Sequence, residues 1–394
     1  MSEAELREVV VVGGGPAGAA VAARLAGLGH DVLVLDRARF PRRKPCGECV
    51  NPAGVAALRA LGAWARVEAA GYARLDGWRI DAGAGRGFTG AFPGGVHGIG
   101  IPRAALDALL LDHARSRGAE VREGARVTEV LREGGRVRGV RVDDGAGERE
   151  IAARVVVGAD GLRSVVVRRL GLIRRPPRLR KLALTAHVRG WDGAARRGEL
   201  RARGRGCVGI ADVGDGTANV TVVATGDGAK AAAGDAAAYF DEALARYGFS
   251  ELERVDGVLA TGPFDWPIRR AIVDGALLVG DAAGYYDPFT GQGIFRALRG
   301  AELAAETLSA ALRAGEVSAS ALAPYERARR RAFGPGERLQ HVVEAFVSRP
   351  ALLRAVSARF TRRPALGDAI IHVTGDVRPV RSLLRPEVVA RLVF

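Results

Sequence analysis

The stretch VVVVGGGPAGAA, Val9 to Ala20, is the part of the sequence that decides the fold. Four consecutive valines are typical of a strand buried in a parallel sheet, and the small residues that follow predict a helix from Pro16 to Leu28. A second short apolar run, Val32 to Leu35, predicts another strand and ends in Asp36. Strand, glycine turn, helix and strand together predict one βαβ unit.

The three glycines of the turn fit the chemistry of a bound dinucleotide. Gly13 permits the tight turn, Gly15 lets the backbone approach a pyrophosphate, and Gly18 lets helix and strand pack closely. The helix N-terminus offers free N–H groups and the positive end of its dipole to the phosphates. Asp36 is placed to accept hydrogen bonds from a ribose. We therefore predict a dinucleotide site rather than a glycine-rich turn without a ligand.

Composition and charge narrow the class of protein. A chain of 394 residues with 48% hydrophobic content can bury a large core and is long enough for two or three structural units. The first residues lack the layout of a secretory signal, and no uncharged run reaches the roughly 18 residues of a membrane span. We therefore expect a cytoplasmic protein. The net charge of +15 comes mostly from arginines scattered through every segment, so we expect no nucleic-acid partner. Peripheral contact of the basic C-terminal tail with a membrane surface stays open.

Cysteines and histidines give no sign of a metal site. Three cysteines in a chain of this length are too few for a disulfide framework, and we expect them to be reduced. Cys46 and Cys49 have Cys-x-x-Cys spacing, but no second ligand pair lies at a matching distance, so we predict no metal. We expect surface or packing roles for the isolated histidines His30, His97, His113, His187, His341 and His372.

Changes in pattern divide the chain into four regions. Residues 1–171 combine the βαβ unit with further helix, strand and hairpin patterns, whereas residues 172–270 show short alternating strands that predict a separate antiparallel sheet. Residues 271–333 return to strand, loop and long helix, and residues 334–394 form a basic tail with helical spacing. The expected fold class is α/β: a Rossmann-like domain with an inserted antiparallel sheet domain and a helical C-terminal tail.

Two later segments resemble a known family. VVVGADGLRSVVVRRLGL, from Val155, and GALLVGDAAGYYDPFTGQGI, from Gly275, resemble the second and third sequence marks of the FAD-dependent superfamily of aromatic hydroxylases and geranylgeranyl reductases. With the glycine turn, the resemblance spans residues 9–312 in the family's order. It implies FAD as the resident cofactor, a first domain of the glutathione-reductase type that binds FAD, and NAD(P)H as a transient co-substrate.

The resemblance also implies which residues hold FAD. Asp160 and Gly161 would lie beside the pyrophosphate, Asp281 would bind the ribityl chain, and Arg103 would contact the phosphate region. The residues expected to bind the cofactor are Gly13, Gly15, Pro16, Ala17, Gly18, Asp36, Arg37, Cys46, Gly47, Arg103, Val127, Asp160, Gly161, Gly280, Asp281, Pro288, Gly291, Gln292, Gly293 and Ile294. A physical argument supports the residues around Gly293, because a helix that begins near Gly293 would stabilise negative charge on a reduced flavin.

The KPCGE turn, from Lys44 to Glu48, resembles the Pro-Cys-Gly turn of the geranylgeranyl reductases. The resemblance implies that Cys46 lies near the isoalloxazine, where it is our candidate catalytic residue, and that Gly47 allows close approach. A redox dithiol would need a helix start, which the prolines and glycine of this stretch oppose, so we expect Cys49 to serve packing. The family's Tyr-x-Trp-x-Phe-Pro substrate motif has lost its Trp and Phe-Pro in the corresponding stretch, GCVGIADVGDGTANVTVV. That loss argues against a geranylgeranyl substrate.

The favoured function is an FAD-dependent monooxygenase that uses O2 and NAD(P)H to hydroxylate an apolar, aromatic or polyketide-like molecule of secondary metabolism. The alternatives are an ene-reductase that acts on an isoprenoid or lipid C=C bond, and a flavin-binding or lipid-binding protein without turnover. Four aromatic residues are candidates for the substrate wall: Trp266, Tyr285, Tyr286 and Phe289. Trp266 stands alone and does not match the Trp-x-Trp-x-Ile-Pro mark of the flavin halogenases.

Overall fold

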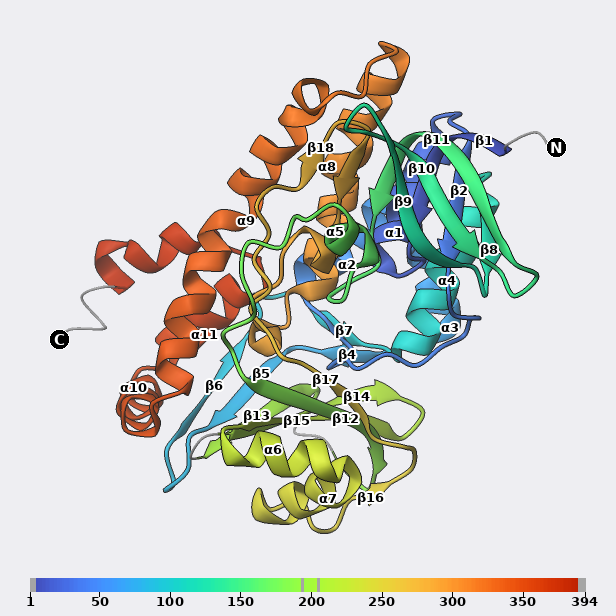
Figure 1. The fold of residues 1–394 in the computed structure, drawn as a ribbon. Helices are drawn as coiled ribbons and strands as arrows, with labels where there is room; N and C mark the ends of the chain where they lie inside the picture. The colour runs from blue at the N-terminus through green and yellow to red at the C-terminus, as the bar shows by residue number, and fades with distance from the viewer. Residues whose placement is uncertain (1–4, 193–194, 204–205, 389–394) are drawn as a thin grey trace.

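A computed structural model describes residues 5–192, 195–203 and 206–388. Its strands form two large sheets, which lie one above the other in Figure 1, and a small third sheet. The described strands are β1 (Glu5–Val12), β2 (Val32–Asp36), β3 (Cys49–Val50), β4 (Ala73–Leu75), β5 (Gly77–Asp81), β6 (Gly87–Ala91), β7 (Gly98–Gly100), β8 (Glu120–Glu123), β9 (Arg126–Glu133), β10 (Arg136–Asp143), β11 (Glu148–Gly158), β12 (Lys181–Arg189), β13 (Arg197–Arg203), β14 (Gly206–Gly214), β15 (Thr217–Thr225), β16 (Glu253–Arg254), β17 (Leu259–Thr261), β18 (Ile272–Val273) and β19 (Ala276–Leu278).

The helices differ greatly in length. They are α1 (Pro16–Gly27), α2 (Pro52–Leu61), α3 (Trp64–Ala70), α4 (Arg103–Ser116), α5 (Val165–Arg169), α6 (Asp227–Gly234), α7 (Ala236–Arg246), α8 (Gly293–Arg313), α9 (Ala319–Val347), α10 (Pro350–Arg362) and α11 (Pro364–Thr374), with short 3-10 helices η1 (Gly280–Ala283), η2 (Pro288–Thr290) and η3 (Val380–Leu384). Helix α1 begins where the sequence predicts and ends within a residue of the predicted end.

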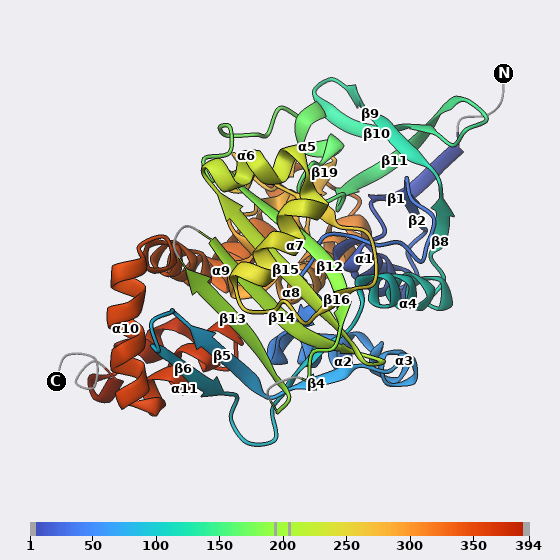
Figure 2. The same cartoon turned by 90° about the horizontal axis from the view of Figure 1, so that it is seen from below.

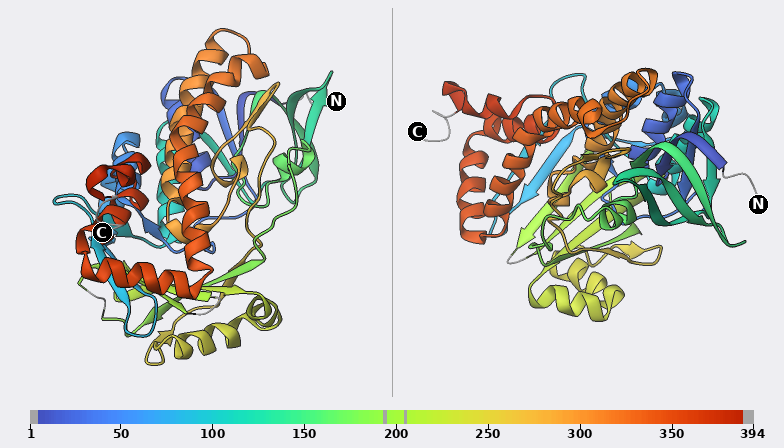
Figure 3. Two further views of the ribbon diagram at one scale, coloured as in Figure 1. Left: turned by 90° about the vertical axis from the view of Figure 1, so that its left-hand side faces the viewer. Right: turned by 45° about the horizontal axis from the view of Figure 1, so that its top comes forward.

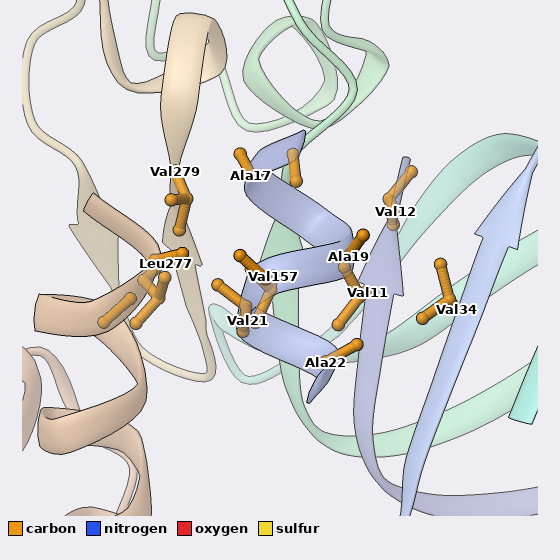
Figure 4. Packing of buried hydrophobic residues seen from close by; sticks show 14 of the residues in the cluster. Val11, Val12, Ala17, Ala19, Val21, Ala22, Val34, Val157, Leu277 and Val279 are labelled. Atoms are coloured by element: carbon orange, nitrogen blue, oxygen red, sulfur yellow. The ribbon is translucent and has the colours of Figure 1, made fainter. Parts of the chain in front are cut away.

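The first sheet has the order β18-β19-β11-β1-β2-β8, with a parallel centre formed by β19, β11, β1, β2 and β8. The four valines of β1 are fully buried or nearly so. Figure 4 shows Ala19 and Ala22 of α1 close to Val11, so the small side chains of α1 let the helix lie close on the sheet. Helix α1 also contacts α4 and α8. The α/β fold class with a Rossmann-like first domain is thereby confirmed.

The second sheet has the order β16-β12-β15-β14-β13-β5-β6, with β17 beside β12. Helices α6 and α7 cover its outer face, as Figure 2 shows, with Val220 and Phe240 among the buried residues between them. The predicted division assigned residues 1–171 to the first domain, but β5 and β6 fall in that range and belong to the second sheet, where β5 pairs with β13 and β6 pairs with β5. The sequence analysis missed this, because a strand pairing between distant segments leaves no local pattern.

The third sheet, β3-β7-β4, lies between the two large ones (Figure 1). Strand β7 lies so close to β14 that a Cβ on Gly100 would be 1.8 Å from the Asp212 carbonyl oxygen. Strand β3 leads into α2, whose N-terminus is capped by Asn51 through a hydrogen bond from the Gly54 N–H. The segment after Cys46 is therefore anchored where the two domains meet.

The C-terminal helices pack on the rest of the molecule. Figure 3 shows α9 running along the molecule from the first sheet to the second, with α10 and α11 at its far end. Helix α9 is continuous across the predicted boundary at residues 333 and 334. Helix α11 lies against β6, where a Cβ on Gly90 would be 2.5 Å from the Gly367 carbonyl oxygen. No helix within the described residues is long and apolar enough to cross a membrane.

Candidate functional site

The turn between β1 and α1 holds two kinds of glycine. Two of them are needed for the backbone to pack, and a third leaves room for a ligand. Gly13 has φ +104°, and a Cβ there would lie 2.6 Å from the Ala159 carbonyl oxygen. A Cβ on Gly18 would lie 1.8 Å from the Gly13 carbonyl oxygen. Gly15 has φ −71°, and a Cβ there would meet just one of the described side chains, Arg42, at 3.6 Å. The space beside Gly15 is therefore open for a ligand.

Asp36 ends β2 beside this turn and is buried. Its Oδ2 accepts a hydrogen bond from the Gly14 N–H at 2.7 Å, so the carboxylate holds the glycine turn in place. The N–H of Ala125 donates to the Asp36 carbonyl oxygen at 2.9 Å, which brings Val127 on β9 to the same edge of the sheet. Val127 is buried and Arg37 is exposed. Their predicted contacts with the cofactor stay predictions.

Three cations gather around the crevice. Arg103 donates from Nε and Nη2 to Asp107, both at 2.7 Å, and Arg42 Nη1 lies 3.1 Å from the same carboxylate. Lys44 Nζ lies 3.4 Å from where a Cβ on Gly161 would stand. Burial, and then the charge of Arg103, lowers the pKa of Lys44. A pyrophosphate would relieve this repulsion among the cations. The sequence analysis missed Arg42 and Lys44, although they directly precede the Pro-Cys-Gly turn.

The residues on the opposite side of the crevice fit FAD as well. Asp160 accepts from the Val165 N–H through Oδ2 at 2.6 Å, whereas its buried Oδ1 has no hydrogen-bond partner among the described residues. Burial raises the pKa of Asp160. A cavity of about 130 Å³ opens here, lined by Gly161, Asp281 and Trp266 among others. Three features of this site suit a dinucleotide. They are the carboxylate oxygen of Asp160 without a described partner, the cluster of cations, and the helix N-terminus at Gly15, which no described side chain caps.

The loop from η1 to α8 carries seven predicted cofactor residues: Gly280, Asp281, Pro288, Gly291, Gln292, Gly293 and Ile294. Asp287 caps η2, and α8 begins at Gly293 as the sequence predicts. A Cβ on Gly291 or Gly293 would meet no described atom within 4 Å. None of the described side chains caps the N-terminus of α8, so its N–H groups are available for a flavin.

Cys46 lies where the Pro-Cys-Gly turn meets α4. Its Sγ accepts from the Glu48 N–H at 3.3 Å, and the residue lies close enough to Arg103 to act on the pKa of its guanidinium. Burial works to lower the pKa of Arg103, but Asp107 and then Cys46 raise it above its usual range. Cys49 instead donates to the Gly47 carbonyl oxygen at 3.1 Å. All three cysteines are free thiols, and Cys46 is the one that lies beside Arg103.

Two of the predicted substrate aromatics lie on the cofactor side. Trp266 and Tyr285 form an antiparallel bridge, and the Tyr285 ring lies 6.0 Å from the Phe264 ring. Burial raises the pKa of Tyr285 well above its usual range, with further effects from Asp281, Asp287 and Cys46. Tyr285 is therefore a protonated phenol close to the Cys46 turn, whereas Trp266 lines the pocket of Gly161.

The other two predicted aromatics face the C-terminal helices. The ring of Tyr286 lies 3.9 Å from that of His341 on α9. Phe289 packs against an apolar cluster that includes Cys207 on β14 and Leu353 on α10. The four aromatics thus line different regions, and their contact with a substrate stays a prediction.

The C-terminal helices contact the loop between η1 and α8. Gln292 donates from Nε2 to Asp376, which follows α11, at 2.8 Å. Burial raises the pKa of Asp376 to about 6. Lys181 at the start of β12 pairs with Asp287 at 3.0 Å and with Glu344 on α9. Residues of the predicted tail therefore help to hold the loop that would face the flavin, a role that no sequence motif signals.

His187 departs from the expectation of a surface or packing role. Its Nε2 lies 2.6 Å from Glu48 and its Nδ1 lies 2.7 Å from Asp256. These three residues are far apart in the sequence and show no recognisable spacing. Among the residues that the structure describes, no group of three or more His, Cys, Asp or Glu is placed to hold a metal ion.

Comparisons with known proteins agree with this geometry. Residues 7–188 match the family described as FAD binding domain. The chain is 32% identical over 326 residues to a menaquinone reductase of Mycolicibacterium smegmatis, covering 77% of this chain and 76% of that one. It is 34% identical over 342 residues to digeranylgeranylglycerophospholipid reductase 1 of Methanopyrus kandleri, covering 81% and 84%.

A solved structure shares the fold across the whole chain. The geranylgeranyl bacteriochlorophyll reductase-like protein of Thermoplasma acidophilum superposes with a TM-score of 0.81 at 21% identity, covering 99% of both chains. The match to the FAD binding domain family, together with the crevice beside Gly15, identifies FAD as the resident cofactor. The chain therefore belongs to the FAD-dependent oxidoreductase superfamily of the aromatic hydroxylases and geranylgeranyl reductases.

Proposed function

We propose that this oxidoreductase is an ene-reductase that reduces a C=C bond of an isoprenoid or lipid substrate. The observation that carries the proposal is the place of Cys46, which lies close enough to both Arg103 and Tyr285 to act on their pKa values. Two relatives that share about a third of their residues with this chain are named as reductases of menaquinone and of a digeranylgeranyl phospholipid. The geranylgeranyl groups in the second name are isoprenoid chains.

The chain's own residues suit this reaction. Bound FAD, reduced by NAD(P)H, would supply a hydride to one carbon, and the other carbon needs a proton. The Cys46 thiol and the Tyr285 phenol are two proton-bearing groups at this place. Phe289, in the loop before α8, packs against the buried Leu353 and Cys207, and this apolar cluster would suit a hydrocarbon chain. This proposal reverses the order that the sequence favoured, and hydroxylation with O2 stays a prediction.

Product analysis separates the two reactions. Anaerobically reduced protein is mixed with menaquinone, with a geranylgeranyl glycerolipid and with a panel of aromatic compounds, and the products are identified by mass spectrometry. We expect an isoprenoid substrate to gain two hydrogen atoms per reduced bond without oxygen. A product that gains one oxygen atom, and forms only in air, would establish the monooxygenase instead. Purified protein without bound flavin would contradict both.

Replacing Cys46 tests its part in the reaction. We expect Cys46→Ala to retain FAD and to lower kcat by about 10²-fold, the usual effect of losing a proton-transferring group. Cys49→Ala is the matched control, because its thiol bonds only to the Gly47 carbonyl oxygen among the described groups. That control should stay within about twofold of the parent protein. Unchanged turnover of Cys46→Ala would reduce Cys46 to a packing role.

A further inference from the structure

Three residues from distant parts of the chain form one hydrogen-bonded row between the domains. His187 projects from β12 of the second sheet and lies between two carboxylates. Its Nε2 is 2.6 Å from Glu48 Oε2, and its Nδ1 is 2.7 Å from Asp256 Oδ2. The backbone N–H of His187 also donates to Asp256 Oδ1 at 2.9 Å. Both ring nitrogens and the backbone of His187 are thus fixed by carboxylates.

Glu48 links this row to the candidate active site. Its Oε1 accepts from the Arg103 N–H at 2.7 Å, so Glu48 caps α4. Its carbonyl oxygen accepts from the Ile101 N–H at 3.0 Å, and its own N–H donates to Cys46 Sγ at 3.3 Å. Glu48 is buried and has φ +56°, a conformation that a residue with a side chain keeps only when its surroundings fix it. The position of Cys46 therefore depends on what holds Glu48.

The charges around His187 favour its protonated form. The hydrogen bond to Glu48 raises the pKa of His187 to about 9, and Asp256 adds to the effect against the opposing effect of burial. Asp256 is itself paired with Arg43 at 2.9 Å, and its carbonyl oxygen accepts from Arg254 at 3.1 Å. At neutral pH His187 is therefore a cation that donates to both carboxylates.

We propose that His187 is a positioning residue, which clamps Glu48 against the second sheet and thereby fixes Cys46 and the start of α4 at the edge of the flavin site. The turn and the sheet belong to different domains, and the row joins them directly. The turn also lies close to the second sheet at Gly47, where an added Cβ would lie 3.7 Å from Thr221 Oγ1 on β15. The catalytic consequence rests on the proposed function, whereas the clamping of the turn does not.

The clamp has a defined pH range. Because the folded pKa is raised from 6.5 to about 9, the stabilising effect is complete below pH 6.5 and is lost as the pH rises through about 9. Turnover should therefore fall through about pH 9, chiefly in kcat. The His187→Gln variant should show a low kcat at neutral pH and no such transition, because a neutral amide holds one carboxylate at most.

Hydrogen exchange tests the clamp without needing a substrate. Holoprotein is compared with His187→Gln at neutral pH, and exchange is followed in the peptide over residues 40–52 and at the start of α4. We expect exchange there to rise about tenfold in the variant. His30→Gln is the matched control. His30 also bonds to a carboxylate, that of Glu8 on β1, but it lies away from the end of β1 that leads into the glycine turn.

The outcomes are separable. Unchanged exchange over residues 40–52 in His187→Gln, or an equal rise in His30→Gln, would overturn the clamp. If His187→Gln does not fold, Asp256→Asn removes one carboxylate, and the turnover transition should move to lower pH. Normal clamping with no ene-reduction on any substrate would refute the proposed function and leave the clamp standing.

Discussion

Gly15→Val is expected to give a folded protein that has lost its FAD. The φ of −71° suits any residue, and of the described atoms only the Arg42 guanidinium comes within 4 Å of a Cβ, at 3.6 Å. The valine methyl groups would occupy the space that the pyrophosphate needs. Flavin absorbance per chain after gel filtration should drop to the background, while circular dichroism and the thermal midpoint of the apoprotein stay unchanged.

Two other glycines give the contrasting results. Gly18→Val should fail to fold as well as fail to bind FAD, because its Cβ would stand 1.8 Å from the Gly13 carbonyl oxygen. Gly94→Val is the neutral control, since no described atom lies within 4 Å of its Cβ and its φ is not positive. Full FAD content in Gly15→Val would show that the pyrophosphate lies elsewhere.

Asp107→Ala is expected to cause the largest loss of stability among single side-chain removals in the crevice. Asp107 is fully buried and holds both Arg103 and Arg42. Its removal leaves two guanidinium groups without their buried partner, which costs about 3–5 kcal/mol of unfolding free energy. Urea unfolding of the apoprotein measures the loss. Added FAD should restore part of it, because the phosphates bring negative charge to the same cations.

An exposed ion pair provides the control for Asp107. Lys230 lies 3.1 Å from Asp227, and the two side chains are 84% and 96% exposed. Lys230→Ala should therefore change the unfolding free energy by less than about 0.5 kcal/mol. A similarly small change in Asp107→Ala would mean that the Arg103 and Arg42 guanidiniums find other partners without it.

Local patterns predicted those parts of the site that lie next to each other in the chain. The glycine turn and the helix that begins at Gly293 are each formed within a few residues, and Asp36 ends the second strand of the same βαβ unit, so their geometry follows from spacing. Arg42 and Lys44 were within reach of the same argument, because they adjoin the Pro-Cys-Gly turn. The insertion of β5 and β6 into the second sheet was not, because the pairing of β5 with β13 joins segments more than a hundred residues apart.

The sequence by itself determined the α/β class, the parallel strand and helix that form the dinucleotide crevice, and the likeness to FAD-dependent oxidoreductases. Hydrophobic periodicity and glycine spacing encode these features locally. Only the tertiary structure placed His187 between Glu48 and Asp256, and brought Asp376 to Gln292. Such contacts depend on how separate elements pack, and a polar side chain carries no mark in the sequence of the partner that it will meet.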